Sequence, residues 1–308
     1  MEAPAPVFIV NRLSETVARK GSVLNAIAKD HDASLYIDNI FDNLDKIITC
    51  TQKNLQNWVF IEGGDGTVQG VLTAFTSAYK GRALPRFTLI PGGMTNQVAG
   101  VIGHKSRRAN SIGRLLQTGG SVIKVPLLRV RSMDVQDLEY VGFLFSTGAV
   151  PMITDYTKSK LHSRGIGGSM AVLGGILKGV KGQNSDVISP THIKIKYNDE
   201  VMNSSHLGTI ATTLPNIFMG LDPFWGRSQD GDIRMTFADA NCRKLLSNIL
   251  SLWRGNNQKD RRADGLYSFN SDSITLEYDG PVVLDGEALT LLGNSFKIGC
   301  TDEVTFLC

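Results

Sequence analysis

Short apolar runs alternate with amphipathic patterns in the N-terminal part of the chain, at residues 6–10, 34–37, 58–62 and 87–90. Between these runs, apolar residues recur at three- and four-residue spacing, which is typical of helices with one buried face. Such patterns run through Val17 and Ile27, fill residues 41–48, and resume at Val68 and at Val98. This order predicts an α/β domain with a parallel sheet covered on both faces.

The pattern changes near residue 122, where strand-like segments become frequent. An antiparallel sandwich or barrel-like domain is the expected result. We therefore predict two domains, at residues 1–121 and 122–308, and the pattern leaves open which of them receives the last strand. Helices are expected at residues 153–161, 170–180 and 242–253. Strands are expected at residues 122–130, 140–147, 191–197, 207–213, 233–237, 273–278, 282–284 and 295–298.

The strand at residues 58–62 runs directly into the turn Gly63-Gly64-Asp65-Gly66-Thr67, and a helical pattern follows at once. Glycines let the backbone approach a ligand closely, and the free N–H groups of a helix N-terminus bind phosphate. Asp65 would repel phosphate unless a cation lay between them, so it is a candidate Mg²⁺ ligand. Thr67 is a candidate helix cap. The turn therefore predicts a nucleotide phosphate site.

This turn also has a simpler interpretation. Glycine pairs occur in ordinary strand-to-helix turns, where an Asp caps the helix or satisfies backbone N–H groups. The turn is not a Walker loop, because no Lys-Ser or Lys-Thr pair follows it. It also lacks the Gly-x-Gly-x-x-Gly spacing of the dinucleotide fingerprint. Both of the commoner nucleotide motifs are therefore excluded.

A second glycine turn, Pro91-Gly92-Gly93-Met94-Thr95-Asn96, leaves the strand at residues 87–90. The carboxyl ends of parallel strands share one edge of the sheet, and ligands bind beyond that edge. We expect the two turns to hold opposite sides of a nucleotide, with Thr95 as a candidate cap for the next helix. The alternative is a tight turn in which Asn96 satisfies its own backbone.

Composition narrows the classes of partner. The 308-residue chain is 42% hydrophobic and 20% charged, as expected for a soluble globular protein. A net charge of +3 without a long Lys/Arg run argues against nucleic-acid binding. The cysteines are scattered without a Cys-x-x-Cys pair, so zinc and disulfides are not expected. With no signal peptide and no bilayer-spanning apolar run, we expect a cytoplasmic protein without a transmembrane segment.

Three motifs in order carry a family resemblance. The two glycine turns, followed near the C-terminus by Leu284-Asp285-Gly286-Glu287-Ala288, resemble the diacylglycerol kinase catalytic family. These bacterial lipid kinases are related to sphingosine and ceramide kinases, and their nucleotide domain is distantly similar to NAD kinase. The segment at residues 145–148 and Phe224-Trp225-Gly226, with Asp230 after it, are also similar to family segments. The resemblance covers nearly the whole chain.

The resemblance implies a two-domain kinase with Mg-ATP in the cleft and a lipid hydroxyl as the phosphoryl acceptor. Glu287 would take the position of the proton acceptor, and Asp230 falls near the family's magnesium site. By match to the motifs, the nucleotide would be contacted by Gly63, Gly64, Asp65, Gly66, Thr67, Gly93, Thr95 and Asn96.

The chemistry of phosphoryl transfer agrees with this assignment. The reaction needs neutralised phosphate charge, alignment, and a group that accepts the proton of the hydroxyl. Asp65 with Mg²⁺, the glycine N–H groups and Glu287 would supply these three. In isolation, Asp285-Gly286-Glu287 is also a common β-turn with solvated carboxylates. We expect an ATP- and Mg²⁺-dependent kinase of diacylglycerol or a similar lipid, acting in lipid metabolism.

Two positions depart from the family pattern. Met94 stands where a hydroxyl is expected, although Thr95 beside it is a candidate substitute, and Gln97 replaces a carboxylate. These departures keep open a non-catalytic nucleotide- or lipid-binding protein on the same scaffold. A kinase of a soluble acceptor, of the NAD kinase type, is the other alternative.

A basic segment is the candidate for membrane contact. Cations near an anionic surface contribute about 1 kcal/mol each. We expect the lipid to be presented at the inner membrane surface here, and a solvated loop and helix face is the alternative. The basic residues are Lys158, Lys160, His162, Arg164, Lys178 and Lys181.

Overall fold

The computed structural model describes residues 5–148, 190–215, 222–226, 230–243, 247–248, 251, 260–290 and 293–308. Its contacts divide the chain into two compact units, one of residues 1–125 with 303–308 and one of residues 126–302. The helices predicted at residues 153–161 and 170–180 lie outside the described residues, as does the basic segment. The helix predicted at residues 242–253 lies outside them for the most part.

The first unit is built on a parallel sheet with the strand order β2-β1-β3-β4. Each strand is an apolar run that the sequence predicts, and the side chains of β1 are fully buried. The end of β15 adds to this sheet in parallel, with Phe306 beside Phe87 of β4, so the last strand returns to the first unit. The four strands are β1 (Val7–Val10), β2 (Ser34–Tyr36), β3 (Trp58–Gly63) and β4 (Arg86–Pro91).

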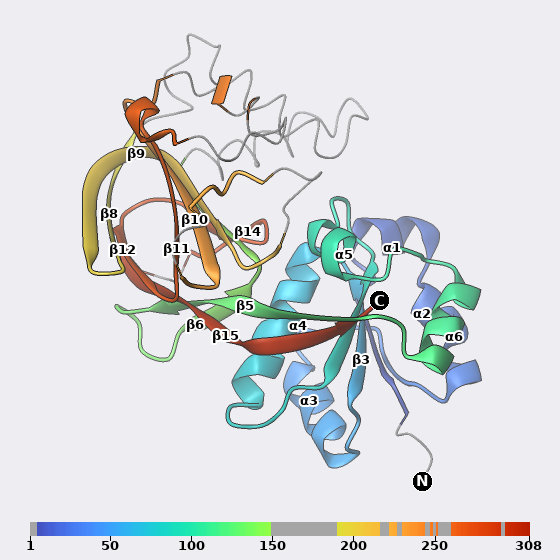
Figure 1. Cartoon of the computed structure of the whole chain (residues 1–308). Coiled ribbons are helices and arrows are strands. Elements are labelled where there is room, and N and C mark those ends of the chain that lie inside the picture. The colour runs from blue at the N-terminus through green and yellow to red at the C-terminus, as the bar shows by residue number, and fades with distance from the viewer. Residues whose placement is uncertain are drawn as a thin grey trace. The chain divides into compact units, whose positions relative to one another are not determined.

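Helices lie on both faces of this sheet (Figure 1). Buried side chains of α1, α2 and α6 form one core cluster with Phe8 and Phe60. On the other face, Phe75 of α4 makes an edge contact with Phe87, at 5.6 Å between ring centroids. The predicted α/β class is therefore confirmed. The helices are α1 (Glu15–Lys20), α2 (Val23–Ile27), α3 (Leu44–Lys53), α4 (Asp65–Ala78), α5 (Gln97–Ile102) and α6 (Ala109–Thr118).

Two helix predictions were wrong in their limits. The continuous pattern through Val17 and Ile27 is two helices, because Gly21 has a positive φ of 80°. Ser22 then caps α2 by accepting the N–H of Asn25 at 3.0 Å. The helix expected at residues 41–48 begins at Leu44 instead.

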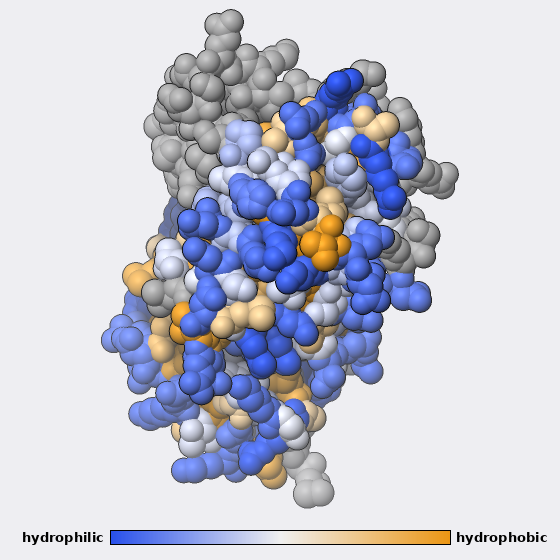
Figure 2. Space-filling view, turned by 90° about the vertical axis from the view of Figure 1, so that its left-hand side faces the viewer, coloured by the Kyte–Doolittle hydropathy of each residue, from blue (hydrophilic) through white to orange (hydrophobic). Residues whose placement is uncertain are grey.

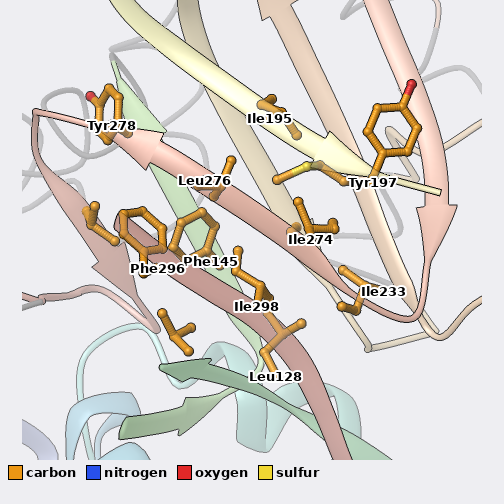
Figure 3. Close-up of a cluster of buried hydrophobic side chains, with 14 of the residues drawn as sticks. Leu128, Phe145, Ile195, Tyr197, Ile233, Ile274, Leu276, Tyr278, Phe296 and Ile298 are labelled. Carbon is orange, nitrogen blue, oxygen red and sulfur yellow. The ribbon is translucent and has the colours of Figure 1, made fainter. Parts of the chain in front are cut away.

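The second unit is rich in antiparallel strands, as predicted. Its core is one cluster of apolar side chains from several strands, including Phe145, Ile195, Leu276 and Phe296 (Figure 3). Burying each such side chain contributes about 1.5–3 kcal/mol. The strands are β6 (Glu139–Gly142), β7 (Leu144–Gly148), β8 (Thr191–Tyr197), β9 (Glu200–Thr212), β10 (Ile233–Asp239), β11 (Leu266–Ser271), β12 (Ile274–Tyr278), β13 (Val282–Leu284) and β14 (Glu287–Ala288). Two more, β5 (Val122–Ser132) and β15 (Ser295–Leu307), run across the boundaries of the units.

Alternation along β8 shows why these segments are strands. Ile193, Ile195 and Tyr197 are buried, whereas Lys194 and Lys196 point outward to Glu277 of β12. A period of two residues places one side chain in the core and the next in water.

The face of the molecule in Figure 2 is mostly hydrophilic, with hydrophobic side chains in small separate groups. None of the helices in the described residues is long and apolar enough to cross a membrane.

Candidate functional site

The first glycine turn joins β3 to α4 at the carboxyl end of the parallel sheet. Gly64 is the N-cap of α4, and the first helical hydrogen bond runs from the N–H of Val68 to the carbonyl of Gly64, at 3.1 Å. The N–H groups of Asp65, Gly66 and Thr67 therefore precede the i→i−4 ladder of the helix. Because α4 has 14 residues, its N-terminus also carries a partial positive charge. The turn is suited to an anion.

The two glycine turns pack directly against each other. The N–H of Gly92 donates to the carbonyl of Gly63 at 2.8 Å. A Cβ atom on Gly93 would lie 2.5 Å from Cα of Gly64, which is too close for any side chain. A Cβ on Gly63 would lie 2.6 Å from the side chain of Thr67. Gly93 is thus required by the contact between the turns and Gly63 by its contact with Thr67, whether or not a ligand is bound.

Asp65 ties the first turn to the helix that follows the second. Its carboxylate accepts the N–H groups of Gln97 and Val98, each at 3.1 Å, and the hydroxyl of Thr95 at 2.8 Å. Asp65 therefore satisfies the N-terminal N–H groups of α5. The predicted capping role of Thr95 was wrong, because its hydroxyl donates to Asp65.

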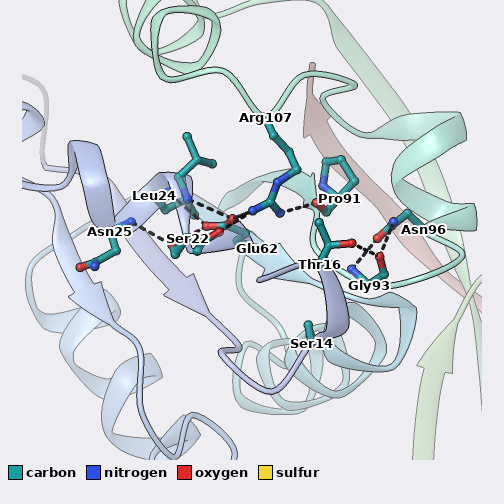
Figure 4. A network of polar contacts seen from close by, with 12 residues as sticks. Ser14, Thr16, Ser22, Leu24, Asn25, Glu62, Pro91, Gly93, Asn96 and Arg107 are labelled. Carbon is teal, nitrogen blue, oxygen red and sulfur yellow. Dashed lines mark hydrogen bonds and ion pairs between the residues drawn. The ribbon is translucent and has the colours of Figure 1, made fainter. Parts of the chain in front are cut away.

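Asn96 closes the second turn on itself. Its side-chain oxygen accepts the N–H of Gly93 at 2.7 Å, and its side-chain nitrogen donates to the carbonyl of Gly93 at 2.8 Å (Figure 4). Asn96 has a φ of 48°, a conformation that asparagine adopts more readily than most residues. The hydroxyl of Thr16 donates to the same carbonyl at 2.7 Å. The N–H of Gly93 is therefore used within the turn.

The loop after β1 supplies two residues that the sequence did not single out. Asn11 donates from its side chain to the hydroxyl of Thr67 at 2.8 Å, and Ser14 accepts the N–H of Gly64 at 3.2 Å. Thr67 lies inside α4 and is buried, so its predicted capping role was wrong. The position of Asn11 in the sequence could have indicated it as a site residue, because it follows a buried strand just as the glycine turns do.

A hollow of about 400 Å³ lies beside α1 in the first unit. One guanidinium, polar groups and aliphatic carbons all contribute to its wall. Such a mixed lining is typical of sites for small ligands that have both polar and apolar parts. The lining residues are Arg12, Val17, Ala18, Gly21, Ser22, Asn25 and Ile37.

The Asp-Gly-Glu motif lies in the second unit, in the tight turn between β13 and β14. Asp285 and Gly286 have positive φ values of 52° and 87°. The buried carboxylate of Asp285 accepts the N–H of Phe143 at 3.0 Å and that of Leu144 at 2.8 Å. Glu287 follows as the first residue of β14, and it is exposed. The turn thus holds an exposed carboxylate on a backbone that Asp285 fixes.

The predicted metal residues do not form a preformed metal site within the described residues. No group of three or more His, Cys, Asp or Glu side chains gathers there. Asp230 is exposed in the second unit. Asp65 already accepts three hydrogen bonds, one of them at Oδ1, which keeps a lone pair. Since Mg²⁺ is usually held by one or two carboxylates with water and substrate phosphates, the lone pair of Asp65 fits an ion that a nucleotide carries.

Fold and turn geometry define an α/β protein with paired glycine turns at the carboxyl edge of a parallel sheet. Residues 7–129 match the family model of the diacylglycerol kinase catalytic domain. The predicted resemblance to that family is therefore confirmed over residues 7–129. No curated protein is a significant match to the sequence.

Solved structures agree with the fold. A diacylglycerol kinase from Bacillus anthracis strain Sterne is 14% identical, with a TM-score of 0.62, and the alignment covers 100% of this chain and 97% of that one. A second protein of that strain, assigned as a diacylglycerol kinase, is 15% identical with a TM-score of 0.69, over 100% and 98% of the two chains. At these identities the likeness shows the fold, and it confirms the predicted fold class.

Proposed function

We propose that the protein is a kinase that transfers phosphate from ATP to a hydroxyl of diacylglycerol or a similar lipid. The observation that carries the proposal is the first glycine turn, whose N–H groups at Asp65, Gly66 and Thr67 precede the helical ladder of α4. Oriented N–H groups at the start of a long helix favour phosphate. The match of residues 7–129 to a lipid kinase catalytic domain supports the same activity.

The two turns have different parts in this proposal. The N–H groups of α4 bind the phosphates of ATP. The N–H of Gly93 is bonded to Asn96, so the second turn supports the first and shapes the site. The hollow beside α1 accommodates the nucleoside, because its lining has both polar and apolar groups.

Mg²⁺ would neutralise charge on the phosphates as ATP reacts. Asp65 is the residue of the first unit that would hold it, through the lone pair left on Oδ1. In the second unit, Asp230 is the other candidate carboxylate. Asp65 would then have two functions, because it also fixes the start of α5.

Glu287 is the proposed general base. It accepts the proton of the lipid hydroxyl as the oxygen attacks phosphorus. Its exposed side chain on a turn held by Asp285 suits a group that must meet an incoming substrate. A lipid presented at the inner membrane surface to a cytoplasmic protein completes the proposal.

The test is a panel of acceptors with γ-labelled ATP and Mg²⁺. Diacylglycerol, a sphingoid base and NAD are each incubated with the purified protein, and the labelled products are identified. We expect label in a lipid. Label in NAD alone would replace the lipid kinase with a kinase of a soluble acceptor, and an absence of label in every acceptor would contradict a kinase.

One observation favours a second candidate, a nucleotide-binding protein without transfer activity. Met94 is 41% exposed where a hydroxyl is expected. The neighbouring hydroxyl of Thr95 donates to Asp65, so it does not simply replace the missing group. Calorimetric titration with ATP, followed by long incubation with the acceptors, separates the two. Binding of ATP with unchanged acceptors would support the binding protein.

A further inference from the structure

Glu62 is a buried carboxylate immediately before the first glycine turn. Its exposure is 0%, and it accepts the hydroxyl of Ser22 at 2.6 Å. It also accepts the N–H groups of Val23 at 3.2 Å and Leu24 at 3.1 Å, at the start of α2. Burying a carboxylate completely costs free energy unless the carboxylate is also paired with a cation.

Arg107 supplies the cation (Figure 4). Its Nη2 atom lies 2.8 Å from Oε1 of Glu62 and donates to the carbonyl of Gly21 at 2.7 Å. Its Nη1 atom donates to the carbonyl of Pro91 at 2.6 Å. The planar guanidinium has several donors in a fixed arrangement, so it can serve these three acceptors together.

These bonds close a ring of contacts around the second glycine turn. Arg107 joins the carbonyl of Pro91 to that of Gly21. The N–H of Gly21 donates to the carbonyl of Val17 at 2.8 Å, and the N–H of Val17 donates to the carbonyl of Gly92 at 3.2 Å. Gly92 follows Pro91 in the chain, so the ring is complete. Loss of Arg107 would open it at the point where the second turn begins.

We propose that Glu62 and Arg107 are positioning residues for the nucleotide, a role that rests on the proposed function. Glu62 holds the guanidinium, and the guanidinium holds Pro91 and α1 in place. The second turn is thereby kept against the first, where Gly93 touches Gly64. Neither residue needs to contact ATP, because the pair acts through the backbone of the turns.

The expected effect is on nucleotide binding. Displacing a supported turn by a fraction of an ångström weakens the alignment of N–H groups with phosphate, so we expect the Kd for ATP to rise about tenfold in R107Q. The KM for ATP rises with it. The rate at saturating ATP changes little, because Glu287 and the acceptor are untouched.

The experiment is calorimetric titration of the full-length protein with ATP, together with KM, kcat and thermal unfolding. The variants are R107Q, R107K and the double variant E62Q/R107Q. R107K keeps the charge but lacks the planar fork, so it should also bind ATP more weakly. Since the two residues act as a unit, the double variant should bind no more weakly than R107Q. The control is R108Q, which removes an exposed positive charge at the next position.

The outcomes separate the inference from the proposed function. If the wild type does not bind ATP, both fail. If the wild type binds ATP and folded R107Q and R107K bind it equally well, the pair only stabilises the fold and the inference is overturned. If R107Q does not fold, the Kd of R107K for ATP decides between the two outcomes. An equal weakening in R108Q would also overturn the inference, because it would show a general effect of charge.

Discussion

The turn that follows β3 and the turn that precedes β14 use an aspartate in the same way and present different groups. Asp65 accepts two backbone N–H groups from Gln97 and Val98, and Asp285 accepts two from Phe143 and Leu144. In the first unit the fixed turn offers backbone N–H groups at the start of a helix. In the second unit it offers the side chain of Glu287.

The difference between the two turns shows how an aspartate in a motif can have a structural role, a chemical role or both. The carboxylate of Asp285 is buried and bonded to backbone, which leaves Glu287, the proposed base, as the exposed carboxylate of its turn. Asp65 is half-buried and bonded to backbone as well, yet it retains a lone pair for an ion. The comparison therefore predicts a catalytic effect mainly at Glu287, a binding effect at the glycine turns, and effects on stability at both aspartates.

The largest expected effect is at Glu287. E287Q removes the proton acceptor while keeping the size of the side chain, so turnover should fall by roughly 10²–10⁴. The affinity for ATP should remain, since the nucleotide is assigned to the turns of the first unit. D279N, at an exposed carboxylate outside the motif, is the matched control. Equal turnover in E287Q and wild type would remove Glu287 from its role.

The next effect is at the contact between the glycine turns. G93A places a Cβ 2.5 Å from Cα of Gly64, so the turns must separate. We expect loss of about 1–3 kcal/mol of stability from overpacking, and ATP binding weakened about 10²-fold. G100A is the control, because a Cβ there meets nothing within 4 Å. Wild-type ATP affinity in G93A would show that close contact between the turns is not needed.

A smaller effect distinguishes the two aspartates. Removing an acceptor from a buried N–H group costs about 1–3 kcal/mol. D285A should therefore reduce the free energy of unfolding more than D65A, because Asp285 and Phe143 are buried whereas Asp65 and Gln97 are partly exposed. Urea denaturation of both variants measures the difference. If D65A were the less stable protein, the two turns would not be anchored as described.

The smallest effect is a pH dependence that differs between the units. Burial lowers the pKa of His206 below its usual value of 6.5, and the hydrogen bond to the carbonyl of Thr191 opposes this shift. The folded state therefore binds fewer protons than the unfolded state below pH 6.5, so stability falls as pH decreases through that value. The slope is at most about 1.4 kcal/mol per pH unit.

His104 in the first unit provides the comparison for this pH effect. Its pKa is also lowered by burial, but the side chain is only half-buried. Denaturation measured above and below pH 6.5 gives the pH dependence of the free energy of unfolding. Replacing His206 should thus change this dependence more than replacing His104. H206Q should remove most of the pH dependence, and an unchanged dependence in H206Q would contradict the assignment.

Local patterns in the sequence predict the parallel sheet well and its helix limits less well. Apolar runs such as the one in β3 are buried on both faces, so they stand out from their neighbours. The break at Gly21 depends on one backbone angle, and the spacing of Val17 and Ile27 continues across it. The apolar pattern of β11 is short, and its pairing with β10 is a tertiary contact that spacing does not reveal.

The candidate site divides in the same way. The sequence identifies the glycine turns and Glu287, because each belongs to a short motif of adjacent residues and the three motifs occur in a recognisable order. The partners of these motifs lie far away along the chain: Asn11 meets Thr67, and Arg107 meets Glu62. Such contacts depend on how the sheet brings its strand ends together, so the capping roles predicted for Thr67 and Thr95 were wrong.

The central claim is the transfer of phosphate from ATP to a lipid. The most direct test is incubation of the purified wild-type protein with γ-labelled ATP, Mg²⁺ and a total lipid extract, followed by identification of the labelled product. The account predicts a labelled lipid phosphate that forms only when the protein is present. Binding of ATP without any labelled lipid would contradict it.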